Sequence, residues 1–140
     1  HGILHSFPTR RSSDLEIVAV LTRAVMSARE EEDGGFLQVS GISFAVSGKK
    51  PTDIRVGGDG RPLDPQASYT VVVPDFLSTG GDGHAVFKGK QYIKTGTPLR
   101  ELIIDTFRQR GSVSAQKEGR IRRADESVSR APWPRPWAYA

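Results

Sequence analysis

The chain has 140 residues, with 20 Lys+Arg, 16 Asp+Glu and no cysteine. That length allows one domain, and the lack of cysteine excludes disulfides and thiolate metal sites. No run of 18 apolar residues occurs, so no membrane-spanning helix is expected. The net charge of +4 lies at the ends, because residues 16–115 carry 12 basic and 12 acidic residues. A nucleic-acid surface needs its charge on the folded part, so we expect no nucleic-acid partner.

The first segment of the chain resembles a library-derived sequence more than part of a natural domain. Residues 5–15, HSFPTRRSSDL, resemble the in-frame translation of a common short-read sequencing adapter. Segments derived from vectors or libraries are set aside before a fold is inferred. We therefore interpret residues 1–15 as a non-native, adapter-derived segment without a stable place in the fold, and the natural chain as truncated upstream. The alternative is a genuine N-terminal arm.

An amphipathic helix is predicted over residues 16–29, because one apolar stripe recurs there at helical spacing. Asp14 is a candidate N-cap, and an acidic run followed by Gly34-Gly35 ends the helix. The stripe consists of Ile17, Leu21, Ala24, Val25 and Ala28.

Residues 35–48, GFLQVSGISFAVSG, are predicted to form β-structure that changes face at Ser40-Gly41. Successive side chains of a strand point to opposite faces. If Leu37 and Val39 face the core, Phe36 therefore points to the opposite side. That orientation makes Phe36 available for a role outside the core.

Shorter β-segments follow. We expect a loop at 49–51 and a strand that turns at Asp59-Gly60. The segment SYTVVVPDF at 68–76 is the strongest predicted strand. Its continuous Val71–Val73 run is typical of burial on both faces, and Pro74 stops it. Residues 91–96 are a further candidate strand.

A second helix is predicted from Thr97 as N-cap, with Pro98 at its first position and Gly111 at its end. Its apolar stripe consists of Leu99, Leu102, Ile103 and Phe107. Residues 122–140 mix three prolines, two tryptophans and charges of both signs without a period, so we expect a disordered basic tail.

Few residues suit bond chemistry. His84 is the single histidine outside the first segment, and a lone histidine is most often a packing or surface residue. No metal site and no catalytic residue are therefore predicted in this chain. The loop PDFLSTGGDGH at 74–84 is better suited to binding, because its glycines let backbone approach a ligand and Asp82 accepts hydrogen bonds. The alternative is a plain turn with Phe76 in the core.

An ordered set of motifs resembles the C-terminal domain of the 5′-nucleotidase family of metallophosphoesterases. The motifs are GGFLQVSG at 34–41, GRPLDP at 60–65, YTVVVPDFLSTGGDG at 69–83 and EGRI at 118–121. The resemblance covers residues 16–121 and implies an α+β fold, layered α/β/β/α with mixed sheets. The chain is then organised as 1–15, the domain at 16–121, and the tail at 122–140.

The resemblance also implies a substrate-binding site. Phe36 and Phe76 would sandwich the nucleobase, and Asp82 would hold the ribose hydroxyls. Gly80, Gly81 and Gly83 shape the loop around Asp82. Asp75 stands where the family often has Asn, which puts any amide donor at that position in doubt.

The family's catalytic half lies upstream of this chain. The parent protein would be a hydrolase acting on nucleotide phosphoesters, with two divalent metal ions in an N-terminal metallophosphatase domain. This fragment is expected to be inactive alone, and the parent to be periplasmic or extracellular. Two alternatives remain: a relative acting on sugar nucleotides, cyclic nucleotides or thiosulfo-esters, and a non-catalytic binding module. The aromatic pair favours a ligand that contains a base.

Overall fold

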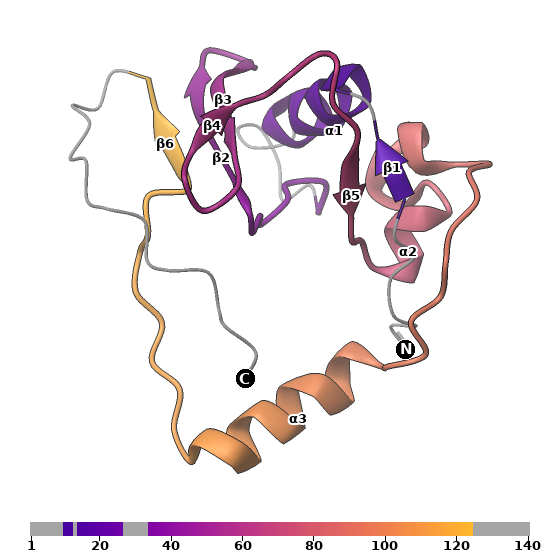
Figure 1. Ribbon diagram of the computed structural model, residues 1–140, viewed down its shortest axis with the longest axis vertical. Coiled ribbons are helices and arrows are strands. Elements are labelled where there is room, and N and C mark those ends of the chain that lie inside the picture. Colours follow the sequence, from indigo (N-terminus) through magenta and orange to yellow (C-terminus); the bar gives the residue numbers. More distant parts are fainter. Residues whose placement is uncertain (1–9, 13, 27–33, 125–140) are drawn as a thin grey trace. The chain divides into compact units, whose positions relative to one another are not determined.

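The computed structural model describes residues 10–12, 14–26 and 34–124, and the chain divides into two compact units (Figure 1). The turn unit combines residues 1–17 with 66–115, and the sheet unit combines residues 18–65 with 116–140. Helix α1 (Asp14–Met26) begins in the turn unit and continues in the sheet unit. Across the described residues, no helix has both the length and the apolar character to cross a bilayer.

The sheet unit contains a four-stranded mixed sheet in the order β4-β3-β2-β6 (Figure 1). Its strands are β2 (Ile42–Ser47), β3 (Lys50–Val56), β4 (Arg61–Pro62) and β6 (Ile121–Arg123). β2 and β3 pair antiparallel, as do β3 and β4, whereas β6 runs parallel to β2. The predicted α+β class with mixed sheet pairing is therefore confirmed, and the four-layer stacking stays a prediction.

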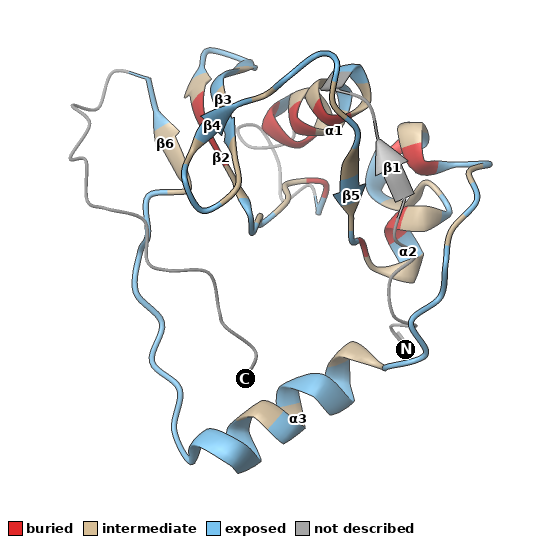
Figure 2. Ribbon diagram, in the orientation of Figure 1, coloured by how far each residue is buried: buried red, intermediate tan, exposed pale blue. Residues whose placement is uncertain are grey.

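Apart from Gly35, the described buried residues of the sheet unit come from α1 and β2 (Figure 2). Leu21, Ala24 and Val25 are buried on α1, which confirms the predicted stripe over its described part. Ser43, Phe44 and Ala45 are buried in succession, so both faces of β2 are covered. Each fully buried Leu, Val or Phe side chain contributes about 1.5–3 kcal/mol of transfer free energy.

The turn unit is made of short elements. β5 (Tyr69–Val71) pairs antiparallel with β1 (Arg10–Ser12), and the one-turn helix α2 (Asp75–Ser78) follows. Two 3₁₀ turns, η1 (Gly81–Gly83) and η2 (Ala85–Phe87), and the helix α3 (Leu99–Arg110) complete it. The pairing of β1 differs from the expectation that residues 1–15 have no place in the fold. Their adapter origin stays a prediction, and residues 1–9 and 13 lie outside the described residues.

Several predicted strands are wrong in extent. Residues 36–39 form no strand, and Phe36, Leu37 and Val39 are all half-buried, so the alternation expected for that stretch is absent. β5 ends at Val71, and Val72 is exposed while Val73 is buried. The chain leaves the sheet before Pro74, which removes the two-sided burial that the valine run predicted.

The loop predicted at 49–51 is shorter than expected, because β3 already begins at Lys50. Pro51 pairs with Val46 of β2. Its missing N–H is tolerated because β4 pairs only with Arg55 and Val56, which leaves Pro51 on a free stretch of strand edge. The turn expected at Asp59-Gly60 is present, and the strand expected at 91–96 is not formed.

The second predicted helix exists, with two differences. Pro98 rather than Thr97 is the N-cap, and no side chain caps the helix, whereas Gly111 ends it as expected with φ of 71°. The apolar stripe is exposed instead of buried, at Leu102, Ile103 and Phe107. β6 also extends past the predicted domain boundary at 121. The ends predicted for the first helix and for the tail fall at 27–33 and 125–140, outside the described residues.

Candidate functional site

The loop singled out from the sequence begins with α2, whose start is fixed by Pro74 and Asp75. Pro74 is the N-cap of α2, and its φ of −59° and ψ of 150° keep the chain extended up to the start of the helix. Asp75 Oδ1 accepts the N–H of Phe76 at 2.8 Å, and a negative charge in the first turn of a helix is favourable. The hydroxyls of Ser78 and Thr79 donate to carbonyls one turn back and limit the helix to that turn. An aspartate therefore supplies the acceptor that an asparagine oxygen would supply here.

The Phe76 ring lies directly against Gly81. A Cβ added at Gly81 would stand 2.5 Å from Phe76 Cε1 and 2.6 Å from the carbonyl oxygen of Phe76. Only a residue without a side chain permits that approach. Phe76 nevertheless remains 55% exposed, so it is not a core residue. One face of the ring is thus fixed against the backbone while much of its surface stays open.

Asp82 lies at the centre of the turn in a left-handed conformation, with φ of 53° and ψ of 29°. Gly80 and Gly83 flank it with φ of 89° and 74°. Aspartate is one of the few side chains that tolerate this region. The Asp82 side chain is exposed, and α2 and η1 pack against each other. The structure therefore brings Phe76, Gly81 and Asp82 together on one turn.

Buried side chains support this turn. Leu77, His84 and Phe87 are buried, and the His84 and Phe87 rings have centroids 6.1 Å apart with an interplanar angle of 38°. The backbone N–H of His84 donates to the carbonyl of Gly81 at 3.1 Å. His84 is thus a packing residue, as expected.

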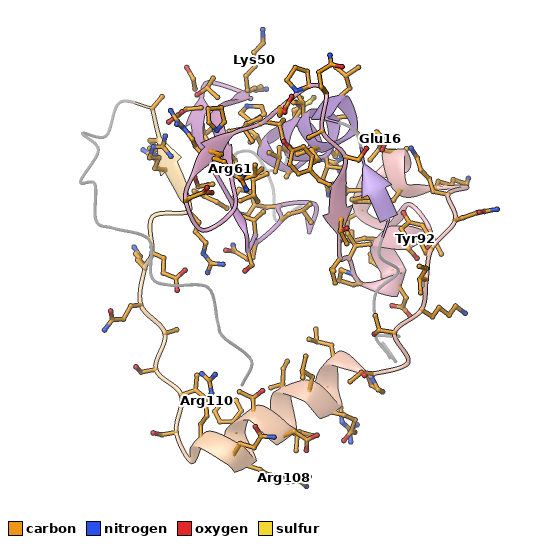
Figure 3. The ribbon with its side chains drawn as sticks, in the orientation of Figure 1. Glu16, Lys50, Arg61, Tyr92, Arg108 and Arg110 are labelled. Carbon is orange, nitrogen blue, oxygen red and sulfur yellow. The ribbon has the colours of Figure 1, made fainter. Side chains whose placement is uncertain are left out.

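Two further contacts hold the segment that follows the turn, and one residue of each, Glu16 and Tyr92, is labelled in Figure 3. Lys90 forms an ion pair with Glu16 of α1, and both side chains are largely buried. Tyr92 donates its hydroxyl to the carbonyl of Phe87 at 2.8 Å. The segment after the turn is therefore held both by Glu16, more than fifty positions before the turn, and by the nearby Phe87.

Phe36 belongs to the sheet unit, in a non-regular segment between a turn at Gly34-Gly35 and a bend at Ser40-Gly41. The Arg120 guanidinium donates to the carbonyl of Val39 in this segment. Sequence reasoning missed this role of Arg120, although it lies within the EGRI motif. The predicted role of Phe36 in binding a base stays a proposal.

Asp53 is a second residue that sequence reasoning missed. It has φ of 47°, at a β-bulge where the pairing of β2 and β3 shifts register. Arg55 Nε donates to Asp53 Oδ1 at 2.8 Å, and Arg122 of β6 donates to Oδ2. The hydrogen bond from Arg55 is the main cause that holds the pKa of Asp53 below its ordinary value, and the charges of Arg55 and Arg122 add to it. The Asp53 carboxylate therefore links β3 to β6 through Arg122.

The described residues offer no candidate metal centre: among them, no three His, Cys, Asp or Glu side chains form a group that fits a metal ion. The exposed aromatic ring and the carboxylate of Asp82 instead suit a ligand with a flat ring and adjacent hydroxyl groups.

The comparisons with known proteins find a family model and several similar proteins. The family model described as "5'-nucleotidase, C-terminal domain" matches residues 15–89. Protein UshA of Salmonella pullorum is 30% identical over 104 residues, covering 74% of this chain and 18% of that protein. A 5'-nucleotidase of Vibrio cholerae is 32% identical over 82 residues, covering 58% of this chain and 14% of that protein.

A solved structure extends the similarity to three dimensions. The crystal structure of a 5'-nucleotidase precursor from Thermus thermophilus superposes with a TM-score of 0.75 at 34% identity. The match covers 89% of this chain and 26% of that one. The present chain therefore spans a minor part of the length of each relative.

Proposed function

Because the chain belongs to the 5'-nucleotidase C-terminal domain family, we propose that it recognises the nucleoside part of a nucleotide for a phosphatase domain of the same parent protein. The parent is a metallophosphoesterase that hydrolyses nucleotide phosphoesters. The observation that carries the proposal is the half-exposed Phe76 ring, fixed on Gly81 and next to the Asp82 turn. Two of the similar proteins are themselves named 5'-nucleotidases, which supports the substrate class.

The binding chemistry follows from these groups. A nucleobase stacks on the open surface of Phe76, an interaction worth about 1–3 kcal/mol that tolerates different bases. Stacking alone leaves the ligand free to turn in the plane of the ring. The Asp82 carboxylate accepts hydrogen bonds from both ribose hydroxyls and fixes that orientation. For Phe36, which lies in the sheet unit, the resemblance implies that its ring stacks on a base as well.

Hydrolysis belongs to the N-terminal domain in this proposal. Two divalent metal ions held there would activate a water molecule and stabilise the phosphoryl oxygens. Among the described residues of the present chain, no group of His, Cys, Asp or Glu side chains fits such a metal ion. The contribution of this chain is to bind the nucleoside and to orient the phosphate that it carries.

The proposal places the parent in the periplasm or outside the cell. One relative, 34% identical over 95 residues, carries the name "Cell wall protein Lmo0130". Extracytoplasmic nucleotides would then be the pool from which substrate is drawn.

The test compares two phenylalanines of similar exposure, Phe76 at 55% and Phe107 at 51%. Adenosine is titrated at millimolar concentration into the isotope-labelled full chain, and chemical shifts are followed. Phe76→Ala should weaken binding by about 1–3 kcal/mol, the value of one lost stacking partner. Phe107→Ala, which removes an equally exposed ring from α3, should leave the affinity unchanged.

Two results would overturn the proposal. One is an absence of shifts at the 76–83 turn in the unmodified chain. The other is equal binding by the Phe76 and Phe107 variants, which would assign the ring no part in recognition. A circular dichroism spectrum of each variant verifies that the fold is retained.

A further inference from the structure

Two side chains lie against consecutive glycines at the start of the Asp82 turn. The Phe76 ring lies against Gly81. Beside Gly80 lies the stem of Lys88: a Cβ added to Gly80 would stand 3.4 Å from Cβ, 3.7 Å from Cδ and 3.8 Å from Cγ of Lys88. These are the separations of carbon atoms in contact. The methylene groups of Lys88 therefore border Gly80 on the side where a side chain would project.

Lys88 is held in this place by its neighbours in the chain. It ends η2 with φ of −66° and ψ of 139°, and its backbone N–H donates to the carbonyl of Ala85 at 3.1 Å. The preceding Phe87 is buried, and its carbonyl accepts the Tyr92 hydroxyl at 2.8 Å. The Lys88 ammonium group makes no hydrogen bond or ion pair with another described residue. The contact of Lys88 with the turn is therefore made by its stem and not by its charge.

Gly80 brings backbone freedom to the start of the turn. It has φ of 89°, and glycine has more conformational freedom than any other residue. Asp82 follows two positions later and is exposed, so little packing of its own side chain fixes it. A lysine can lay its methylene groups along a surface and keep its charge in water. The stem of Lys88 is thus placed to restrict the glycine on which the position of Asp82 depends.

We propose that Lys88 is a positioning residue of the nucleoside site: its stem, packed beside Gly80, holds the turn in the conformation that presents the Asp82 carboxylate to the ribose hydroxyls. This inference rests on the proposed function and uses residues of the turn unit alone. A turn that is ordered before the ligand arrives loses less conformational entropy when the ligand binds. Lys88 acts through Asp82 and touches no substrate atom.

The test separates the stem of Lys88 from its charge in the full chain. Lys88→Ala removes Cγ and Cδ, so it should raise the adenosine dissociation constant about threefold and speed amide exchange at residues 80–83. Lys88→Met keeps an unbranched stem without the charge, so the dissociation constant should change by less than about twofold. Lys94→Ala, at another exposed lysine of the same unit, is the matched control and should change neither quantity. Lys88 is exposed, so the variants are expected to fold.

Adenine distinguishes the positioning of Asp82 from a general loosening of the unit. Because adenine has no ribose, its dissociation constant should change by less than about twofold in Lys88→Ala. Three results would each overturn the inference and leave the proposed function intact: unchanged adenosine binding by Lys88→Ala, equal losses in the alanine and methionine variants, or equal losses for adenosine and adenine. If the unmodified chain shows no adenosine shifts, the proposed function fails first and this inference with it.

Discussion

Asp53 and Asp82 share a rare backbone conformation, and both are exposed, but their carboxylates differ in their partners. They are the two non-glycine residues with positive φ in the described part of the chain. Asp53, in the sheet unit, has both carboxylate oxygens bound by arginines. Asp82, in the turn unit, is exposed, and its carboxylate has no hydrogen bond or ion pair to any other described residue. Strained backbone marks a residue worth inspecting, and the partners of its side chain separate a structural role from a ligand-binding one.

Among the substitutions at these two aspartates, Asp53→Ala should change the free energy of unfolding most. The substitution places a side chain that disfavours positive φ at the bulge and leaves Arg55 and Arg122 without their acceptor. We expect the free energy of unfolding to fall by about 1–2 kcal/mol, measured by urea denaturation. Asp53→Gly removes the same carboxylate but relieves the backbone, so its loss should be about half. An alanine variant as stable as the unmodified chain would contradict the structural role.

Asp82→Asn should weaken ligand binding and leave the stability of the fold nearly unchanged. Asparagine tolerates left-handed backbone as well as aspartate does, so the free energy of unfolding should stay within about 0.5 kcal/mol. Adenosine affinity should fall by about 1 kcal/mol, roughly fivefold, because a charged acceptor of two hydroxyls is lost. Adenine, which has no ribose, serves as the control ligand in the same titration. Equal losses for adenosine and adenine would show that Asp82 does not hold the sugar.

The smallest expected effect is a pH dependence of the free energy of unfolding, caused by the ionisation of Asp53. Since hydrogen bonding to Arg55 lowers the pKa of Asp53 in the folded state from 3.8, ionised Asp53 stabilises the fold. This contribution is complete above the unfolded pKa and is lost as the pH falls through the folded pKa. The Asp53 side chain is 45% exposed, so solvent screening limits the effect to about 0.5 kcal/mol.

The pH effect is measured as a difference between two chains. Unfolding of the unmodified protein and of Asp53→Asn is compared from about pH 6 to about pH 2. The stability gap should narrow below about pH 4. A gap that stays constant would mean that the ion pairs of Asp53 do not contribute to stability in solution.

The two main helices show how far the sequence predicts structure. Both carry an apolar stripe at helical spacing, and both are formed. The stripe of α1 is buried at Leu21 and Val25, whereas that of α3 is exposed at Ile103 and Phe107. Periodicity identifies the apolar face of a helix, but burial depends on which other element covers that face, and no local pattern contains this information.

The candidate site likewise has features that the sequence predicts and features that it does not. The glycine-rich turn around Asp82 was predictable, because glycine, aspartate and proline have strong local preferences. The support from Arg120 and the pairing of Asp53 with Arg122 were not, because they join residues far apart in the sequence through side chains whose own preferences are weak. The segment at 36–39 has strand-forming residues, yet the ladder that a strand requires was not formed there.

The parallel pairing of β6 with β2 has a consequence for biosynthesis. Residues 66–115 of the turn unit separate the two parts of the sheet unit in the sequence. β2 therefore cannot pair with β6, as in the Phe44–Ile121 pair, until the ribosome has made residue 121. During translation the edge of β2 stays unpaired, and contacts between such distant residues form slowly. An open strand edge pairs readily with another chain. In the interval between the synthesis of β2 and that of β6, this edge of β2 is therefore open to pairing with another chain.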